Sequence, residues 1–165
     1  MLRTLLTSAF LLAATTAFAQ TPNSLGQFND WTAWSYPGEN GTVCFIHSVP
    51  KREMPSDLNH GKVAFFVRTS PSENISNEAN FVVGYPFEEK STVTVDIDGK
   101  KFTMFTKGDS AWLLNAAEEP ELFAAMKAGK SMKISGKSRR GNETTYEYSL
   151  SGVTAASNKV SATCN

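Results

Sequence analysis

Histidine and cysteine, which most often bind metals and carry out nucleophilic catalysis, are scarce in this sequence of 165 residues. It contains two of each. A zinc site needs three or four protein ligands. The one suggestive pair, Cys44 and His47, would point to opposite faces of a strand. Because only His60 remains to join them, we expect no metal site.

The short motifs of common catalytic and phosphate-binding sites are missing as well. Ser149 stands in Tyr-Ser-Leu-Ser-Gly, which is not the Gly-x-Ser-x-Gly turn of a serine hydrolase. Two Gly-Lys-Ser triplets, at 129–131 and 136–138, lack the earlier glycine of a nucleotide-binding P-loop. An acidic cluster is formed by Glu118, Glu119 and Glu121. Acidic residues are favoured where a helix begins, which explains this cluster without catalysis. We predict that the protein is not an enzyme and holds no cofactor, and a small periplasmic enzyme or enzyme inhibitor is the alternative.

No excess of charge of either sign is present, since 16 basic residues balance 16 acidic ones. Proteins that bind nucleic acid or anionic membranes through their overall charge carry a basic surplus. We therefore expect no nucleic-acid partner, although local charged patches stay open.

A hydrophobic run long enough to span a membrane is also absent. The apolar stretch 5–18 is interrupted and shorter than the about 20 residues of a membrane helix. It follows the basic Arg3 and ends in the small-x-small sequence Ala17-Phe18-Ala19, which is typical of a secretory signal peptide. We predict a cleaved signal peptide at 1–19, with an uncleaved anchor as the alternative. Residues 20–165 are then one domain without a membrane span, periplasmic or secreted, in solution or associated with the outer membrane.

Alternating apolar and polar residues run through most of the mature chain. This pattern predicts strands at 28–36, 42–49, 62–69, 80–85, 92–97, 100–106, 131–137 and 144–150. A helix is predicted at 118–128 and a short one at 153–160, while 111–114 could be a strand or the start of a helix. Many short strands with one or two short helices indicate a mainly β protein, an antiparallel β-sandwich.

The clearest local signal is Asp98-Gly99, which separates two alternating runs. Asp-Gly favours a tight hairpin turn because both residues tolerate positive φ. The resulting register places Val93 and Val95 opposite Met104 and Phe102, and it places Asp96 opposite Lys101.

Two features remain candidates for sites. In an exported protein, Cys44 and Cys164 are expected to form a disulfide, with a reactive Cys44 thiol as the alternative. Four basic residues lie along one predicted strand and the turn after it: Lys133, Lys137, Arg139 and Arg140. They form a possible interaction patch for an acidic partner, or a solvated edge that discourages the addition of another strand.

A set of short motifs in the order of the chain resembles the invasion-associated locus B family of secreted α-proteobacterial proteins. These motifs are Phe28-x-x-Trp31, Cys44-Phe-Ile, Gly84-Tyr-Pro-Phe87, Ile97-Asp-Gly99 with Phe102, Gly108-Asp-x-Ala-Trp112, Met126-Lys-x-Gly129, Gly136-x-Ser-x-Arg-Gly141, Tyr148-Ser-Leu-x-Gly152 and Cys164. The resemblance implies an immunoglobulin-like β-sandwich, export, and an association with host-cell invasion in some pathogens. It implies no known chemistry. We therefore expect a non-enzymatic exported protein that binds an envelope or host-surface partner, either a protein or a glycan.

Overall fold

The computed structural model describes residues 21–164, and the predicted signal peptide lies outside them. Eleven strands form one antiparallel sheet in the order β1-β2-β3-β5-β6-β9-β8-β7-β10-β11-β4. The strands are β1 (Asn23–Phe28), β2 (Trp31–Gly38), β3 (Gly41–Ser48), β4 (Arg52–Met54), β5 (Ala64–Ser70), β6 (Ile75–Val82), β7 (Thr92–Ile97), β8 (Lys100–Lys107), β9 (Ser110–Leu113), β10 (Ser131–Lys137) and β11 (Glu143–Ser149). The helices are α1 (Glu119–Ala128) and α2 (Val153–Cys164), with 3₁₀ turns η1 (Pro71–Glu73) and η2 (Ala116–Glu118).

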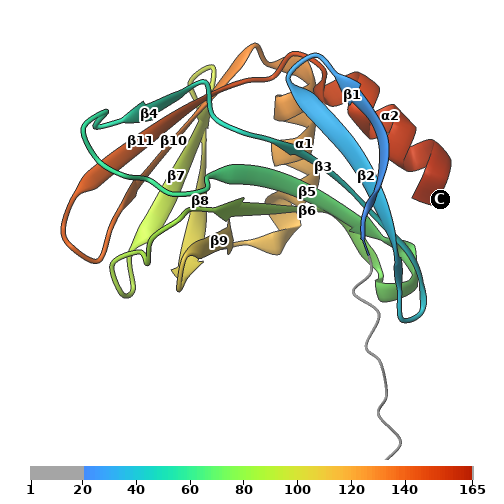
Figure 1. Cartoon of the computed structure of the whole chain (residues 1–165), viewed down its shortest axis with the longest axis horizontal. Coiled ribbons are helices and arrows are strands. Elements are labelled where there is room, and N and C mark those ends of the chain that lie inside the picture. Colours follow the sequence, from blue (N-terminus) through green and yellow to red (C-terminus); the bar gives the residue numbers. More distant parts are fainter. Residues whose placement is uncertain (1–20, 165) are drawn as a thin grey trace, which may run out of the picture.

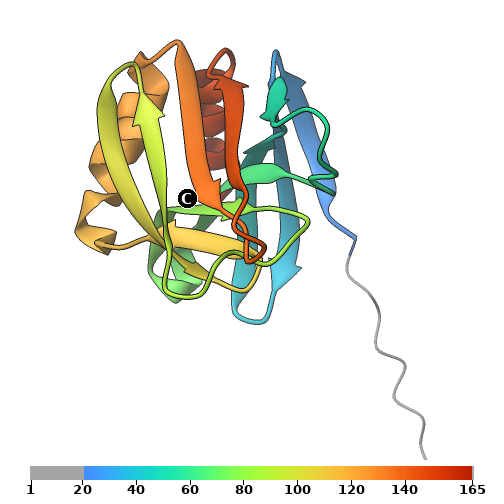
Figure 2. The ribbon, with the colours of Figure 1, turned by 90° about the vertical axis from the view of Figure 1, so that its left-hand side faces the viewer.

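The sheet curls so that its two arms face one another across the core (Figures 1 and 2). Phe65 of β5 contacts Tyr148 of β11 with ring centroids 6.3 Å apart, and Phe81 of β6 contacts Tyr146 at 5.3 Å. At the start of β2, the Trp31 indole donates a hydrogen bond to the carbonyl of Ser149, 2.9 Å away. The prediction of a mainly β, antiparallel sandwich with two short helices is therefore confirmed.

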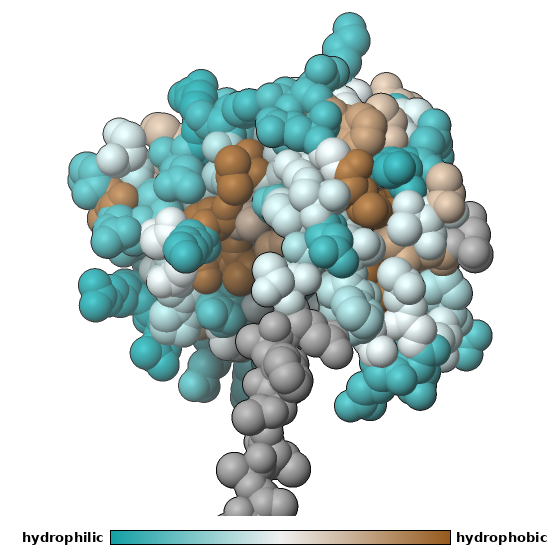
Figure 3. Space-filling view, turned by 45° about the vertical axis from the view of Figure 1, so that its right-hand side comes forward, coloured by the Kyte–Doolittle hydropathy of each residue, from teal (hydrophilic) through white to brown (hydrophobic). Residues whose placement is uncertain are grey.

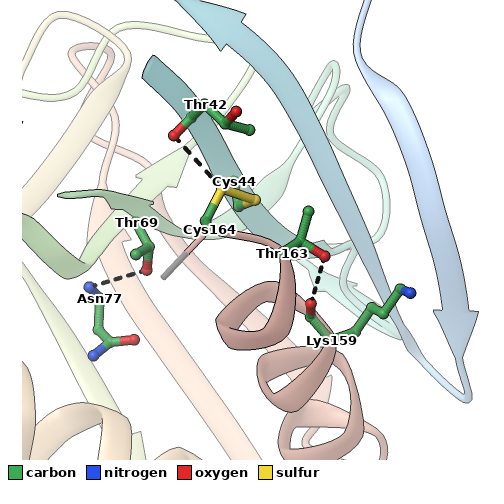
Figure 4. Close-up of a disulfide and its surroundings, with 7 residues drawn as sticks. All are labelled: Thr42, Cys44, Thr69, Asn77, Lys159, Thr163 and Cys164. Carbon is green, nitrogen blue, oxygen red and sulfur yellow. Dashed lines mark hydrogen bonds between the residues drawn. A yellow bond between two sulfur atoms is a disulfide. The ribbon is translucent and has the colours of Figure 1, made fainter. Parts of the chain in front are cut away.

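Helix α2 holds the C-terminal end of the chain against β2 and β3. Its Val160 is buried, and its last residue, Cys164, forms a disulfide with Cys44 of β3 (Figure 4). Cys44 and Ile46 face the core, whereas Phe45 and His47 lie on the outer side of β3, as the alternation predicts. The disulfide therefore clamps α2 to the core side of the strand that carries these aromatic rings outside.

Helix α1 begins with the acidic cluster and packs on β6. Leu122 and Met126 are buried, and the Glu119 carboxylate accepts a hydrogen bond from the amide of Ala79, 3.0 Å away. Burial raises the pKa of Glu119 to about 7, against the lowering effect of that hydrogen bond. Of the acidic cluster, Glu119 thus helps to dock the helix on β6.

The hairpin β7–β8 has the predicted register. Val95 lies opposite Phe102, and Asp96 lies opposite Lys101. The turn residues Asp98 and Gly99 have φ values of 49° and 98°. Local turn chemistry and alternation therefore suffice to specify this part of the sheet.

Three segments differ from the sequence-based expectation. The expected first strand at 28–36 is two strands, because the chain reverses at Asn29, whose φ is 52°. The expected loop 50–61 contains β4, which is held by its pairing with β11. β6 begins at Ile75, inside an expected loop. The segment 111–114, which could have been a strand or the start of a helix, is a strand up to Leu113, where β9 ends.

Among residues 21–164, no helix has the length and apolarity needed to cross a membrane. In the same part of the chain, no group of three or more histidine, cysteine or acidic side chains is arranged to hold a metal ion.

Candidate functional site

A cleft of about 410 Å³ lies where three connecting segments meet at one end of the sandwich. These segments are the loop after β4, the loop after β6 and the turn between β10 and β11, and the last two lie side by side in Figure 1. We call this the basic cleft. Its lining includes Asn59, His60, Tyr85, Arg139, Arg140, Asn142 and Thr144.

Two glycines allow the first two loops to approach one another backbone to backbone. The amide of Gly84 donates a hydrogen bond to the carbonyl of His60, 3.0 Å away. A Cβ atom at Gly84 would lie 2.5 Å from the Cα of Gly61, which is closer than side chains tolerate. Glycine at this position therefore brings His60 and Tyr85 to the same wall of the cleft.

The β10–β11 turn is fixed to the loop after β6 by its backbone. The amide of Arg139 donates to the carbonyl of Pro86 at 2.9 Å, and the amide of Asn142 donates to the Ser138 hydroxyl at 3.1 Å. Arg139 and Arg140 are exposed, and neither takes part in an ion pair within residues 21–164. Two guanidinium groups on an anchored turn are therefore available to an acidic ligand.

Behind the cleft, polar side chains form a series of hydrogen-bond contacts, which we call the His60 chain. His60 Nε2 lies 2.8 Å from the carbonyl oxygen of Pro55, and His60 Nδ1 lies 2.9 Å from the Tyr146 hydroxyl. The Tyr146 hydroxyl is 2.7 Å from the Tyr85 hydroxyl, which is 2.7 Å from the Thr144 hydroxyl. The Thr144 hydroxyl donates to the carbonyl of Gly136 at 3.0 Å. Burial raises the pKa values of Tyr85 and Tyr146, so both hydroxyls stay protonated. His60 is buried, with 4% of its surface exposed, and both of its ring nitrogens have partners.

The four basic residues predicted as a patch fall into two groups. Lys133 lies opposite Asp96 on one side and Glu147 on the other, and the Lys137 ammonium is 3.1 Å from Glu88. Carboxylates therefore surround the lysine half of the patch, whereas the two arginines line the basic cleft.

Sequence reasoning did not assign His60 and Tyr85 to this site. One signal could have pointed to it. The motifs Gly84-Tyr-Pro-Phe87 and Gly136-x-Ser-x-Arg-Gly141 are far apart in the chain, and both supply residues to the cleft.

A second concavity, of about 840 Å³, lies on the outer side of β2, β3 and β5. We call it the aromatic groove, after Trp34, Phe45, His47 and Phe66 in its lining. The rings of His47 and Phe66 stack with centroids 5.6 Å apart, and the Trp34 indole donates to His47 Nδ1 at 3.1 Å. Burial lowers the pKa of His47. Figure 3 shows a face of the molecule where apolar surface gathers between hydrophilic side chains.

No free cysteine remains among residues 21–164, because Cys44 and Cys164 are joined. Cys44 is completely buried, on the opposite side of β3 from the aromatic groove. In this structure the pair therefore has a structural role.

Comparisons with known proteins agree with the motif resemblance. One solved structure, described as the crystal structure of invasion associated protein b from Bartonella henselae, matches with a TM-score of 0.62 and 18% sequence identity. The match covers 86% of this chain and 97% of that chain, and at this identity it shows a shared fold. A search of curated proteins gave no match. The family model described as "Invasion associated locus B (IalB) protein" matches residues 31–161. The chain therefore belongs to the invasion associated locus B (IalB) family.

Proposed function

We propose that this IalB-family protein is an exported, non-enzymatic binding protein whose basic cleft receives an acidic sugar of an envelope or host-surface glycan. The signal-peptide pattern at 1–19 and a disulfide, which persists mainly in oxidising compartments, support export. The description of the solved relative as an invasion associated protein fits a role at a cell surface. The exposed arginine pair at the mouth of the cleft carries the proposal.

The lining of the cleft suits an acidic sugar better than a bare ion. Guanidinium groups pair with carboxylates through two parallel hydrogen bonds. The amides of Asn59 and Asn142 can donate to and accept from sugar hydroxyls, and Tyr85 adds a half-buried aromatic ring. The volume of about 410 Å³ is that of a small-ligand site.

The same geometry argues for binding rather than for hydrolysis. His60 is the only titratable imidazole at the cleft, and a general base needs a free lone pair near its substrate. One nitrogen of His60 contacts a carbonyl oxygen, and the other contacts the Tyr146 hydroxyl. The ring is therefore committed to the His60 chain and has no nitrogen left for a substrate.

The binding test uses the mature protein, residues 20–165, with glucuronate and glucuronate-containing oligosaccharides in a titration calorimeter. Arg139→Ala/Arg140→Ala should weaken binding by about tenfold or more per arginine, because each charge-assisted pair contributes about 1.5–3 kcal/mol. Lys127→Ala/Lys159→Ala removes two exposed positive charges on the helices α1 and α2, neither of which lines the cleft, and should leave affinity unchanged. Equal loss in both double variants, or no binding by wild type, would contradict the proposal.

Two further arms identify the source of the acidic group and the location of the protein. Binding of inorganic phosphate in preference to glucuronate would point to phosphorylated lipid or protein instead of an acidic sugar. Fractionation of cells that express the full chain, with mass spectrometry of its N-terminus, tests export. A protein that begins at Gln20 in the periplasm or medium is expected, and an unprocessed cytoplasmic protein would contradict it.

A further inference from the structure

Both terminal groups of the His60 chain are hydrogen-bond acceptors. The carbonyls of Pro55 and Gly136 have no proton to donate. Between them lie four side chains, whose hydrogen bonds within residues 21–164 are the five of this series, with the Thr144 hydroxyl also close to that of Tyr146. Each of the five contacts in the series therefore needs one proton from these four side chains.

With a neutral imidazole, the His60 chain is one proton short. His60, Tyr146, Tyr85 and Thr144 each supply one proton to the five contacts. Whatever the direction of donation, one contact must bring two lone pairs together, and the five distances lie between 2.7 and 3.0 Å. A buried polar contact without its proton is costly.

A second proton on the His60 ring completes the series. Nε2–H then donates to Pro55, and Nδ1–H donates to the Tyr146 hydroxyl. Tyr146 donates to Tyr85, Tyr85 donates to Thr144, and Thr144 donates to Gly136. Loss of a proton from either tyrosine would instead deepen the deficit, and burial raises the pKa values of both.

The charges around His60 connect this proton to the contents of the cleft. Arg139 and Arg140 line the cleft together with His60, so in the empty cleft they oppose a positive imidazole. An acidic group, Glu53 of β4, lies opposite Tyr146 in the sheet and acts electrostatically on the tyrosine that contacts His60. An anion held by the arginines would offset their charge and favour the protonated ring.

We infer that the basic cleft takes up its acidic ligand together with one proton, which is held on the ring of His60 and completes the His60 chain. This inference rests on the proposed function, because it assigns the proton to the same cleft. The proton comes from the buffer, which loses it, and one ring nitrogen of His60 gains an N–H bond, while no bond within the ligand is made or broken. By linkage, affinity falls by about tenfold for each pH unit wherever the complex holds one proton more than the empty protein, and it levels off where the two hold the same number.

The test measures the protons taken up per molecule of sodium glucuronate bound. Titration calorimetry of the mature protein at pH 7 is repeated in bis-tris and in Tris buffers. These buffers are cationic, so they do not compete for the arginines, and they absorb clearly different heats when they lose a proton. An uptake near one proton per glucuronate is expected, and uptake near zero from pH 5 to pH 8.5 would overturn the inference.

A matched pair of substitutions at Thr144 separates the proton count from a general structural effect. Thr144→Val keeps the side-chain shape but removes one proton and two contacts, so a neutral His60 chain is then balanced. Because Thr144 also lines the cleft, the readout is not affinity but the proton uptake per glucuronate bound, which should be near zero and depend little on pH. Thr144→Ser keeps the hydroxyl and should retain the uptake. Equal uptake in the two variants would contradict the role of the His60 chain.

The outcomes keep this inference distinct from the proposed function. Binding without proton uptake contradicts the inference and leaves the proposed function standing. If wild type binds no glucuronate, the proposed function fails, and ¹⁵N chemical shifts of the His60 ring still test the proton count without a ligand. The His60 ring of wild type should then hold its second proton to a higher pH than the His60 ring of Thr144→Val. Identical titrations of the ring in these two proteins would overturn the inference.

Discussion

The two histidines of this chain lie in different concavities, the basic cleft and the aromatic groove, and their hydrogen-bond partners favour different protonation states. His47 lies in the aromatic groove, where the Trp34 indole donates to its Nδ1. An indole N–H can only donate, so His47 satisfies this partner as a neutral ring. His60 lies behind the basic cleft, between a carbonyl and a tyrosine hydroxyl, in a series that needs one more proton than its neutral groups hold.

Burial alone does not decide which protonation state a histidine prefers. Burial lowers the pKa of His47, and its one identified hydrogen-bond partner acts in the same direction. His60 is nearly inaccessible, yet its neighbours in the His60 chain are short of a donor. Counting the donors and acceptors therefore separates a packing residue in the groove from a candidate proton site at the cleft.

Removal of the disulfide should have the largest effect and should act on the groove side alone. Cys44→Ala/Cys164→Ala releases α2 from β3, and loss of a native disulfide typically costs about 2–5 kcal/mol. Urea unfolding should show this loss, and hydrogen exchange should rise in β2, β3 and α2. Amides around the basic cleft should keep their protection, and an equal rise in both regions would show that the two concavities are not independent.

Gly84→Ala should damage the basic cleft and spare the aromatic groove. The added methyl would meet the backbone of Gly61 and His60, and overpacking of this kind costs about 1–3 kcal/mol. Binding of glucuronate should fall, while the NMR signal of the Trp34 indole N–H in the groove should be unchanged. The control is Gly108→Ala, where a Cβ meets nothing within 4 Å and only the conformational cost of about 1 kcal/mol is expected. A larger loss of stability in the control would contradict the backbone contact.

Local features of the sequence predict the strands of the cleft and groove but not the sites themselves. The β7–β8 register follows from Asp98-Gly99 and from alternation, both of which act over a few residues. β10 was predicted with its observed bounds, and its inward-facing Met132 and Ile134 are buried, because strict alternation also acts locally.

The failures lie where distant segments meet. β4 has three residues and forms only because β11, about 90 residues later, supplies its partner. The role of His60 depends on Tyr146, which is 86 residues away in sequence. The sequence predicts one patch because the four basic residues are neighbours in the chain. The loop after β6 divides them, since its Pro86 holds the turn with the two arginines at the cleft and its Glu88 pairs with Lys137.

Tyr146→Phe should destabilise the protein in a way that depends on pH. The inference places the second proton of His60 on the ring at low pH, where the variant loses hydrogen bonds worth about 1 kcal/mol each. At pH 8.5 the wild-type series contains an unmade contact, so removal of the hydroxyl should cost less. The penalty in urea unfolding should therefore shrink as pH rises. Tyr148→Phe is the matched control, since its buried hydroxyl has no partner among the described residues and should cost little at either pH. Parallel penalties at both pH values would contradict the proton deficit.

The smallest effect is expected at His47, and its sign is the opposite of that at His60. Burial lowers the pKa of His47 in the folded protein, so below the ordinary value of about 6.5 the unfolded chain binds a proton that the folded chain does not. Stability from this residue is therefore present above that pH and is lost as the pH falls through it. His47→Gln removes the titration and keeps a side chain that can accept from Trp34. The free energy of unfolding of wild type relative to His47→Gln should decrease between pH 7.5 and pH 5. A relative increase over that range would mean that His47, like His60, sits among groups that favour its charged form.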